Sequence, residues 1–160
     1  MKRVVLDASV ILKWYLPDEN YGEKALSLLH QYVSGELDIL GPTLLEYEVM
    51  NGLILAQKRG RIREEKILAA IEGFTDLQIT LKSAFSFYWK AIHYSKAYNR
   101  SAYDASYLAV ADQEGLSIIT ADQGLYNAVK KDLKWMKWLG DIEDSLTTKE
   151  KFTANIELVI

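Results

Sequence analysis

The sequence predicts an α/β fold, a central parallel sheet of four to five strands flanked by helices on both faces. Two observations lead to this prediction. Short apolar runs rich in β-branched residues alternate along the chain with longer segments in which apolar residues recur at helical spacing. Strands that alternate with helices pair in parallel, because each helix carries the chain back across the sheet. In such a sheet, ligands bind outside the carboxyl ends of the strands.

Five segments have the length and composition of strands. The first, "RVVL", is β-branched and ends directly before Asp7, and "LSIIT" ends two residues before Asp122. "DIL", "LQITL" and the apolar residues of "LKWMKWL" complete the set. The expected strands are residues 3–6, 38–40, 77–81, 116–120 and a last strand within 133–139.

Helical periodicity fills the segments between these strands. In the first helix, apolar residues recur from Ala25 to Val33, and Gly35 closes the helix. Gly41 and Pro42 open the next helix, which runs to about Lys58. The remaining helices are expected at residues 64–72, 83–98, 102–114 and 124–131.

Length and composition indicate the class of protein. A chain of 160 residues, 49% of them apolar, is the right size for one domain with a hydrophobic core. It contains no apolar run of about 18 residues that would span a bilayer, and its first residues lack the pattern of a secretory signal. The expected location is the cytoplasm, without a membrane partner.

Residue types restrict the possible metal sites. The sequence has no cysteine, which excludes disulfides, thiolate nucleophiles and cysteine-bound metal, and its two histidines are too few for a histidine-rich site. Any metal would therefore be a hard ion bound by oxygen. The net charge of -3 argues against non-specific coating of nucleic acid, but it leaves room for a local basic groove beside an acidic pocket.

Three aspartates occur at the points where ligands of a parallel sheet bind. Asp7 and Asp122 follow strands, and Asp104 lies in the first turn of a helix, three residues after Ser101. Each of them has an ordinary structural explanation as a helix cap, and "SAYD" fits a capping box. Acids gathered at one sheet edge would also repel one another, and a bound cation gives a reason for them to converge.

A fourth acid is expected on the helix that follows Pro42. Glu46 and Glu48 are both candidates, and they lie on opposite flanks of the buried stripe, so helical periodicity does not choose between them. Glu46 could form a capping box with Thr43. Glu48 shares its flank with Asn51, which could orient a carboxylate, and this favours Glu48.

Four segments together resemble a known family. "VVLDASVI", "PTLLEYEVMNGL", "AYDASYLAVA" and "IITADQGL" match in order and spacing the motifs of the PIN-domain ribonucleases, especially the VapC-type toxins of toxin–antitoxin pairs. The resemblance covers residues 1–140 and implies a PIN-like nuclease domain there. Residues 141–160 form a C-terminal tail outside the pattern, and no role is assigned to them.

The resemblance also implies a function and a site. It selects Glu48 over Glu46, and it implies a Mg²⁺- or Mn²⁺-dependent endoribonuclease that forms a homodimer and is neutralised by a small antitoxin protein. Supporting polar groups near the metal would come from Ser9, Asn51 and Thr120. The implied catalytic and metal-binding residues are Asp7, Glu48, Asp104 and Asp122.

Other interpretations of these residues remain. Lys13 and Arg100 lie near the acidic segments and are candidates for contacts to RNA, with ordinary surface charge as the alternative. An aspartyl-phosphate mechanism would need a second aspartate two residues after Asp7, where this chain has Ser9. A PIN-like nuclease for RNA processing or quality control, without an antitoxin, and a catalytically silent binding module are the two further alternatives.

Overall fold

One parallel sheet forms the centre of the molecule. The structure is a computed structural model that describes residues 1–143. The strands lie in the order β3-β2-β1-β4-β5, and all neighbouring strands are parallel. The predicted α/β sheet is confirmed, with five strands. Their bounds are Lys2–Leu6 (β1), Leu37–Pro42 (β2), Thr80–Lys82 (β3), Ile118–Thr120 (β4) and Met136–Trp138 (β5).

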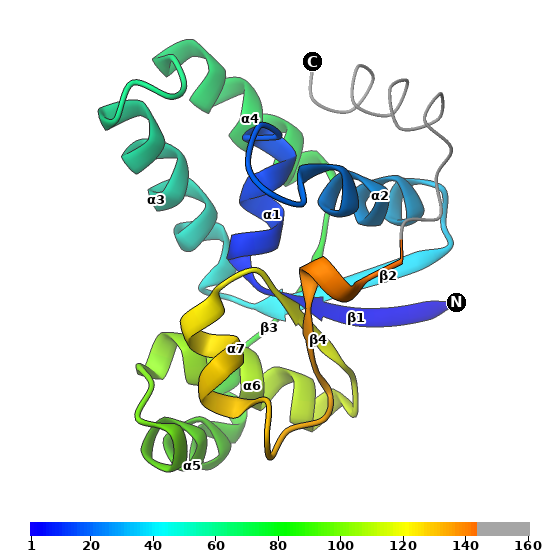
Figure 1. Cartoon of the computed structure of the whole chain (residues 1–160), viewed down its shortest axis with the longest axis vertical. Helices are drawn as coiled ribbons and strands as arrows, with labels where there is room; N and C mark the ends of the chain where they lie inside the picture. Colours follow the sequence, from blue (N-terminus) through cyan, green and yellow to red (C-terminus); the bar gives the residue numbers. More distant parts are fainter. Residues whose placement is uncertain (144–160) are drawn as a thin grey trace.

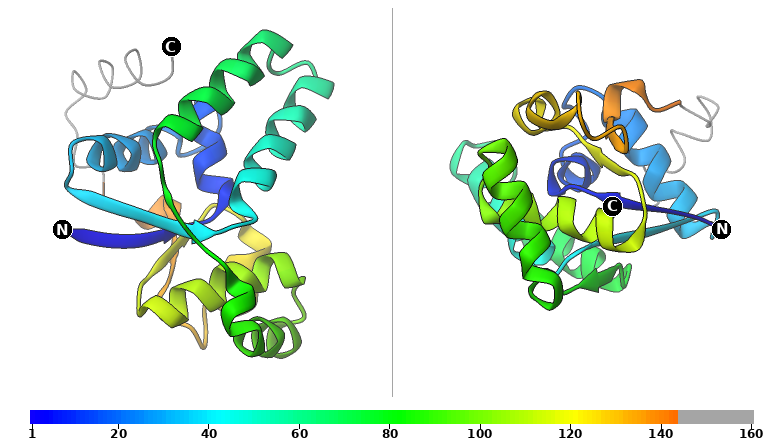
Figure 2. Two further views of the ribbon diagram at one scale, coloured as in Figure 1. Left: turned by 180° about the vertical axis from the view of Figure 1, so that it is seen from behind. Right: turned by 90° about the horizontal axis from the view of Figure 1, so that it is seen from below.

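Helices cover both faces of this sheet (Figures 1 and 2). The helices that connect β1, β2 and β3 lie on one face, and those that follow β3 lie on the other. The first group comprises α1 (Ala8–Tyr15), α2 (Gly22–Val33), α3 (Leu45–Lys58) and α4 (Glu64–Asp76). The second group comprises the short helix η1 (Ala84–Phe87), α5 (Tyr88–Tyr98), α6 (Ala102–Glu114) and α7 (Gln123–Val129), and η2 (Leu139–Asp141) follows β5.

The order of the strands reverses between β1 and β4. The chain runs outward from β1 to β2 and β3, and then returns to the other side of β1 to form β4. Leu6 pairs with Ile119, and the backbone nitrogen of Asp7 donates a hydrogen bond to the carbonyl oxygen of Ile119 at 3.0 Å. Ligands of open α/β sheets bind at such a reversal of strand order. The segments that carry Asp7 and Asp122 meet there.

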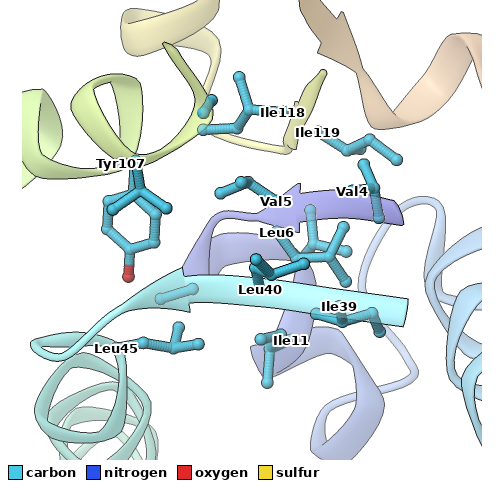
Figure 3. Close-up of a cluster of buried hydrophobic side chains, with 14 of the residues drawn as sticks. Val4, Val5, Leu6, Ile11, Ile39, Leu40, Leu45, Tyr107, Ile118 and Ile119 are labelled. Atoms are coloured by element: carbon cyan, nitrogen blue, oxygen red, sulfur yellow. The ribbon is translucent and has the colours of Figure 1, made fainter. Parts of the chain in front are cut away.

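The core fixes the positions of these elements. Side chains of β1, β2 and β4 pack against α1 on one face and α6 on the other (Figure 3). Tyr107 of α6 is fully buried, and its hydroxyl group points away from α6 and towards β2. Trp14 is also fully buried, and its ring nitrogen donates a hydrogen bond to the carbonyl oxygen of Ala25 at 2.8 Å. The acid-bearing ends of the strands therefore rest on a rigid, close-packed base.

Two element boundaries differ from the sequence prediction near β2. Gly41 and Pro42 belong to this strand and do not open α3, because they pair with Leu81 and Lys82 of β3. The helix begins at Leu45, and its N-cap residue Leu44 makes no side-chain cap. The capping box expected from Thr43 and Glu46 is therefore not formed.

Other boundaries differ for local reasons. The strand expected at 77–81 is confined to Thr80–Lys82, because Gln78 adopts a left-handed conformation with φ of 52°. The helix expected at 83–98 is divided into η1 and α5. Most of the predicted tail, residues 144–160, lies outside the described residues. Within residues 1–143 no helix combines the length and apolar character needed to cross a bilayer.

Candidate active site

Asp7 lies at the end of β1 with its carboxylate buried. Its Oδ2 accepts hydrogen bonds from Ser9 Oγ at 2.5 Å and from Thr120 Oγ1 at 3.0 Å. Burial raises the pKa of Asp7 to about 6, the two hydroxyl groups oppose this rise, and the charges of Asp104 and Asp122 add to it. Although Asp7 is the N-cap residue of α1, its side chain makes no cap hydrogen bond.

Two hydroxyl groups connect the end of β1 to the end of β4. Ser9 Oγ accepts a hydrogen bond from the backbone nitrogen of Ala121 at 2.9 Å, and Thr120 Oγ1 accepts one from the backbone nitrogen of Asp122 at 3.0 Å. Both hydroxyl groups also donate to Asp7. The backbone that carries Asp122 is therefore held beside the Asp7 carboxylate.

Asp122 does act as a helix cap. Its Oδ1 accepts a hydrogen bond from the backbone nitrogen of Leu125 at 3.1 Å, in the first turn of α7. This occupies one carboxylate oxygen and leaves the other without a hydrogen bond to the described residues. A cap and a ligand are therefore compatible functions for this side chain.

In α6 the capping function and the acid are on different residues. Ser101 Oγ accepts a hydrogen bond from the backbone nitrogen of Asp104 at 3.1 Å and caps the helix. The Asp104 carboxylate faces Arg100 instead of the helix end. Its Oδ2 lies 3.0 Å from Arg100 Nε and 2.9 Å from Arg100 Nη2. Arg100 thus balances part of the negative charge.

The structure distinguishes the two glutamates of α3. Glu46 is exposed, whereas Glu48 is half-buried and its Oε1 is fully buried without a hydrogen-bond partner in residues 1–143. Burial raises the pKa of Glu48, the nearby Tyr107 hydroxyl lowers it, and the charges of Asp7 and Asp104 raise it further. The Tyr107 hydroxyl faces Glu48 but falls short of a full hydrogen bond. Glu48 thus belongs to the same electrostatic cluster as the aspartates.

The acids suit a hard divalent cation in their chemistry. The cluster of Asp7, Glu48, Asp104 and Asp122 offers only oxygen ligands, and each carboxylate keeps an oxygen that makes no hydrogen bond to the described residues. As the side chains stand, no three histidine, cysteine, aspartate or glutamate side chains within residues 1–143 are grouped closely enough to hold a metal. Two of the acids bond to other groups in this arrangement: Asp104 pairs with Arg100, and Asp122 caps the start of α7.

The predicted supporting and RNA-binding residues have different environments. Ser9 and Thr120 contact Asp7 directly, and exposed Asn51 lines a cavity together with Glu48. Lys13 is buried, and its Nζ lies 3.2 Å from Glu19 Oε1. Since Arg100 pairs with Asp104, both predicted RNA-binding cations already have acidic partners, and their contacts to RNA stay predictions.

Comparison with known proteins identifies the family. The sequence pattern described as PIN domain matches residues 4–131 of this chain. The chain belongs to the PIN-domain family. Ribonuclease VapC3 of Pyrobaculum aerophilum is 32% identical over 132 residues, which cover 77% of this chain and 92% of that protein. The crystal structure of PAE2754 from Pyrobaculum aerophilum shares the fold, with a TM-score of 0.56, 22% identity, and coverage of 82% of this chain and 90% of that one.

The resemblance deduced from the four motifs is thereby confirmed. One feature of this PIN domain was not assigned to the site from the sequence. The structure places the hydroxyl group of Tyr107, a fully buried residue of α6, beside Glu48. Its spacing of three residues from Asp104 puts both side chains on neighbouring positions of one helical face. That spacing is the signal that indicates Tyr107.

Proposed function

We propose that this PIN domain is a metal-dependent endoribonuclease and the toxin of a toxin–antitoxin pair. One observation carries the proposal. Burial raises the pKa values of Asp7 and Glu48, and neighbouring acids add to both rises: Asp104 and Asp122 act on Asp7, and Asp7 and Asp104 act on Glu48. This negative charge is only partly balanced by protein groups, which suits a site that binds cations. The similarity to a ribonuclease, VapC3, supports RNA as the substrate.

In this proposal the acids Asp7, Glu48, Asp104 and Asp122 hold Mg²⁺ or Mn²⁺. A divalent ion held there would lower the pKa of a bound water and would neutralise charge that develops on the phosphodiester. Ser9 and Thr120 fix the orientation of the Asp7 carboxylate through their hydrogen bonds. Arg100 fixes the orientation of the Asp104 carboxylate through their ion pair, and the Tyr107 hydroxyl lies beside Glu48.

Cleavage of a labelled single-stranded RNA by the purified protein tests the enzyme assignment. We expect cleavage with Mg²⁺ or Mn²⁺, none in EDTA, and none with Asp7→Asn. The two glutamates of α3 offer a matched pair of variants. Glu48→Gln should abolish cleavage, whereas Glu46→Gln, which changes an exposed side chain on the opposite flank of the same helix, should preserve it. Full cleavage in EDTA, or equal activity of the two glutamine variants, would contradict the proposed site.

Growth of cells that express the protein tests the toxin assignment. Expression of the unchanged chain should arrest growth unless a small partner protein is co-expressed, and Asp7→Asn should be harmless. Harmless expression of a chain with demonstrated RNA cleavage would indicate a processing nuclease instead. A homodimer is also part of the proposal, and the exposed apolar residues of η1 and α5 support it.

A further inference from the structure

A polar cavity lies beside the acid cluster, on the side of α7. Its volume is about 490 Å³, and its walls come from the loop after α1, from α7 and from β5. We refer to it as the amide pocket, because three side-chain amides line it together with three aromatic rings. These residues are Asn20, Gln123, Asn127, Tyr21, Tyr126 and Trp138.

The amide pocket lies close to residues of the acid cluster, since Ala121 and Gln123 in its wall flank Asp122 in the sequence. It shares Lys13 and Ala121 with a cavity of about 290 Å³ that Ser9, the partner of Asp7, also lines. That cavity shares Gly52 with a third one, of about 480 Å³, which contains Glu48. The three cavities thus adjoin one another, because neighbouring cavities share lining residues.

Aromatic rings are held in place around the amide pocket. The ring centroid of Trp138 lies 6.1 Å from that of Tyr21 and 5.5 Å from that of Tyr126. Tyr21 is 43% exposed and adopts a left-handed conformation with φ of 64°, which bulky residues rarely do. Gly140 allows the close packing, because a Cβ there would lie 2.6 Å from Trp138 Nε1. Rings fixed in this way provide surfaces on which a base can stack.

Polar groups on one face of α7 complete the pocket. Gln123, Asn127 and Lys130 are spaced by four and three residues, so they follow one another along this face. Neither amide makes a side-chain hydrogen bond to any residue in the range 1–143. Lys130 Nζ lies 5.5 Å from the ring centroid of Tyr126. Amides that are free to donate and accept, beside a ring and a cation, suit a nucleobase and its phosphate.

We propose that the amide pocket binds an unpaired nucleobase of single-stranded RNA while the scissile phosphate lies at the acid cluster. This inference rests on the proposed ribonuclease function and assigns to it a base-binding subsite. Stacking comes from Tyr126 and Trp138, hydrogen bonds to the base edge come from Gln123 and Asn127, and Lys130 contacts a phosphate. Duplex RNA does not offer an unpaired base, so single strands are the preferred ligand.

Photochemical crosslinking locates the base directly. The probe is a 12-nucleotide single-stranded RNA that carries 5-iodouridine, which crosslinks to aromatic residues, and the full chain is irradiated with it in EDTA. Peptide mass spectrometry should identify crosslinks at Tyr21, Tyr126 or Trp138. The same RNA annealed to its complement should crosslink much less. Crosslinks only outside the amide pocket would overturn the proposal, as would the absence of any crosslink.

Two neighbouring lysines give a matched test by fluorescence anisotropy. Lys130 lines the amide pocket. Its neighbour Lys131 is exposed and lines none of the cavities described above. With the same labelled RNA in EDTA, Lys130→Gln should reduce the slope of log K against log salt by about 0.7, the value for one phosphate contact on a single strand. Lys131→Gln should leave the slope unchanged. Equal slopes for both variants would overturn the phosphate contact.

An amide pair tests recognition of the base. Asn127→Ala should weaken RNA binding by about fivefold or more, as expected for the loss of a base contact, whereas Gln113→Ala on the exposed surface of α6 should not. Melting temperatures of all variants confirm that they are folded. If the pocket variants bind RNA normally but no longer bind a co-expressed small protein, the ligand of the amide pocket is a protein and not RNA.

The two proposals fail in different ways. RNA that crosslinks in the amide pocket but is never cleaved with Mg²⁺ or Mn²⁺ would contradict the nuclease function and leave the binding site standing. Metal-dependent cleavage by a chain in which Asn127→Ala and Lys130→Gln change neither binding nor cleavage would contradict the subsite and leave the nuclease function standing.

Discussion

Asp7 is a buried carboxylate whose hydrogen-bond partners are two neutral hydroxyl groups. Its cluster holds three further acids, and Arg100 is the cation that pairs with one of them. An acid in this environment is stabilised in its protonated form, since burial and like charge both disfavour ionisation. The metal-free site therefore opposes folding at neutral pH. Removal of the charge and addition of a cation should both stabilise the protein.

The first prediction follows from the pKa of Asp7, which burial raises from its ordinary value of 3.8 to about 6 in the folded protein. The native state binds more protons between these values, so the free energy of unfolding in EDTA should fall as the pH rises from about 4 to 6. Asp7→Asn should flatten this dependence and stabilise the metal-free protein at pH 7 by up to about 3 kcal/mol. Urea unfolding at several pH values measures both effects.

A control separates this effect from a general change of net charge. Glu72→Gln neutralises an exposed acid on α4 and should change the stability by less than about 0.5 kcal/mol. A metal-free Asp7→Asn protein that is less stable than the unchanged chain at pH 7 would show that the Asp7 charge is compensated in the fold.

The second prediction concerns the hydroxyl group of Tyr107. Because this group is buried without a full hydrogen bond, Tyr107→Phe should leave the stability in EDTA unchanged or slightly higher. The same variant should raise the pKa of Glu48, whose ionised form the hydroxyl favours, and should shift the pH dependence of RNA cleavage upward. Melting curves and pH–rate profiles measure these changes.

Tyr94 supplies the matched comparison. It is also buried in the packing of α5 on α6, but its hydroxyl donates a hydrogen bond to Asp112 Oδ2 at 2.7 Å. Tyr94→Phe should therefore cost about 1 kcal/mol and leave the pH dependence of cleavage unchanged. If both phenylalanine variants lose stability equally, the Tyr107 hydroxyl makes a full hydrogen bond in solution.

At the scale of the element, the helix cap and the acid at the start of α6 are on different residues. Ser101 caps the helix, while Asp104 in its first turn faces Arg100 and the acid cluster. The capping box predicted from "SAYD" is thus half formed, because Arg100 attracts the acid away from the helix end. A sequence pattern identifies positions in the first turn, but it does not determine the side-chain conformation there.

The third prediction uses this separation. Ser101→Ala should destabilise the protein by about 1 kcal/mol both in EDTA and in Mg²⁺, because it removes a cap. Asp104→Asn should change the stability in EDTA by less than about 1 kcal/mol, since the lost ion pair with Arg100 is offset by weaker repulsion within the cluster. Thermal melting of both variants measures this.

Magnesium should then distinguish the two variants. A hundredfold excess over Kd stabilises a protein that binds the ion only when folded by about 2.7 kcal/mol. Ser101→Ala should retain this gain, and Asp104→Asn should lose most of it. Equal gains for both variants would mean that Asp104 does not bind the metal.

The same scale shows how far sequence patterns predict this fold. The order of the strands and of the helices from α2 onward came from apolar periodicity, whereas α1 was not predicted as an element. The positions of Asp7 and Asp122 followed from the parallel sheet. The predicted end of β2 was wrong. Gly41 and Pro42 are typical of turns, but their pairing with β3 keeps them in a strand. Contacts between distant segments, such as Tyr107 with Glu48, depend on packing that local patterns do not encode.

At the scale of the whole molecule, two surfaces differ in character. The carboxyl edge of the sheet carries the acids and the three adjoining cavities. A second surface, formed by η1 and α5, exposes large apolar side chains around a cavity of about 400 Å³. Its exposed residues are Phe85, Tyr88, Trp89 and Ile92. Contiguous apolar surface of this kind is typical of an interaction site.

The fourth prediction is that this second surface forms the homodimer. Burial of apolar area stabilises association by roughly 25 cal/mol per Å², and Phe85 alone is 85% exposed in the single chain. Ile92→Glu places a charge that would be buried between two copies, so it should shift a dimer to a monomer in sedimentation velocity at micromolar concentration. Leu68→Glu is the control, because Leu68 is 66% exposed but lies on α4, away from this surface. A monomeric unchanged chain would refute the dimer, and a dimer that survives Ile92→Glu but is lost with Leu68→Glu would move the interface to α4.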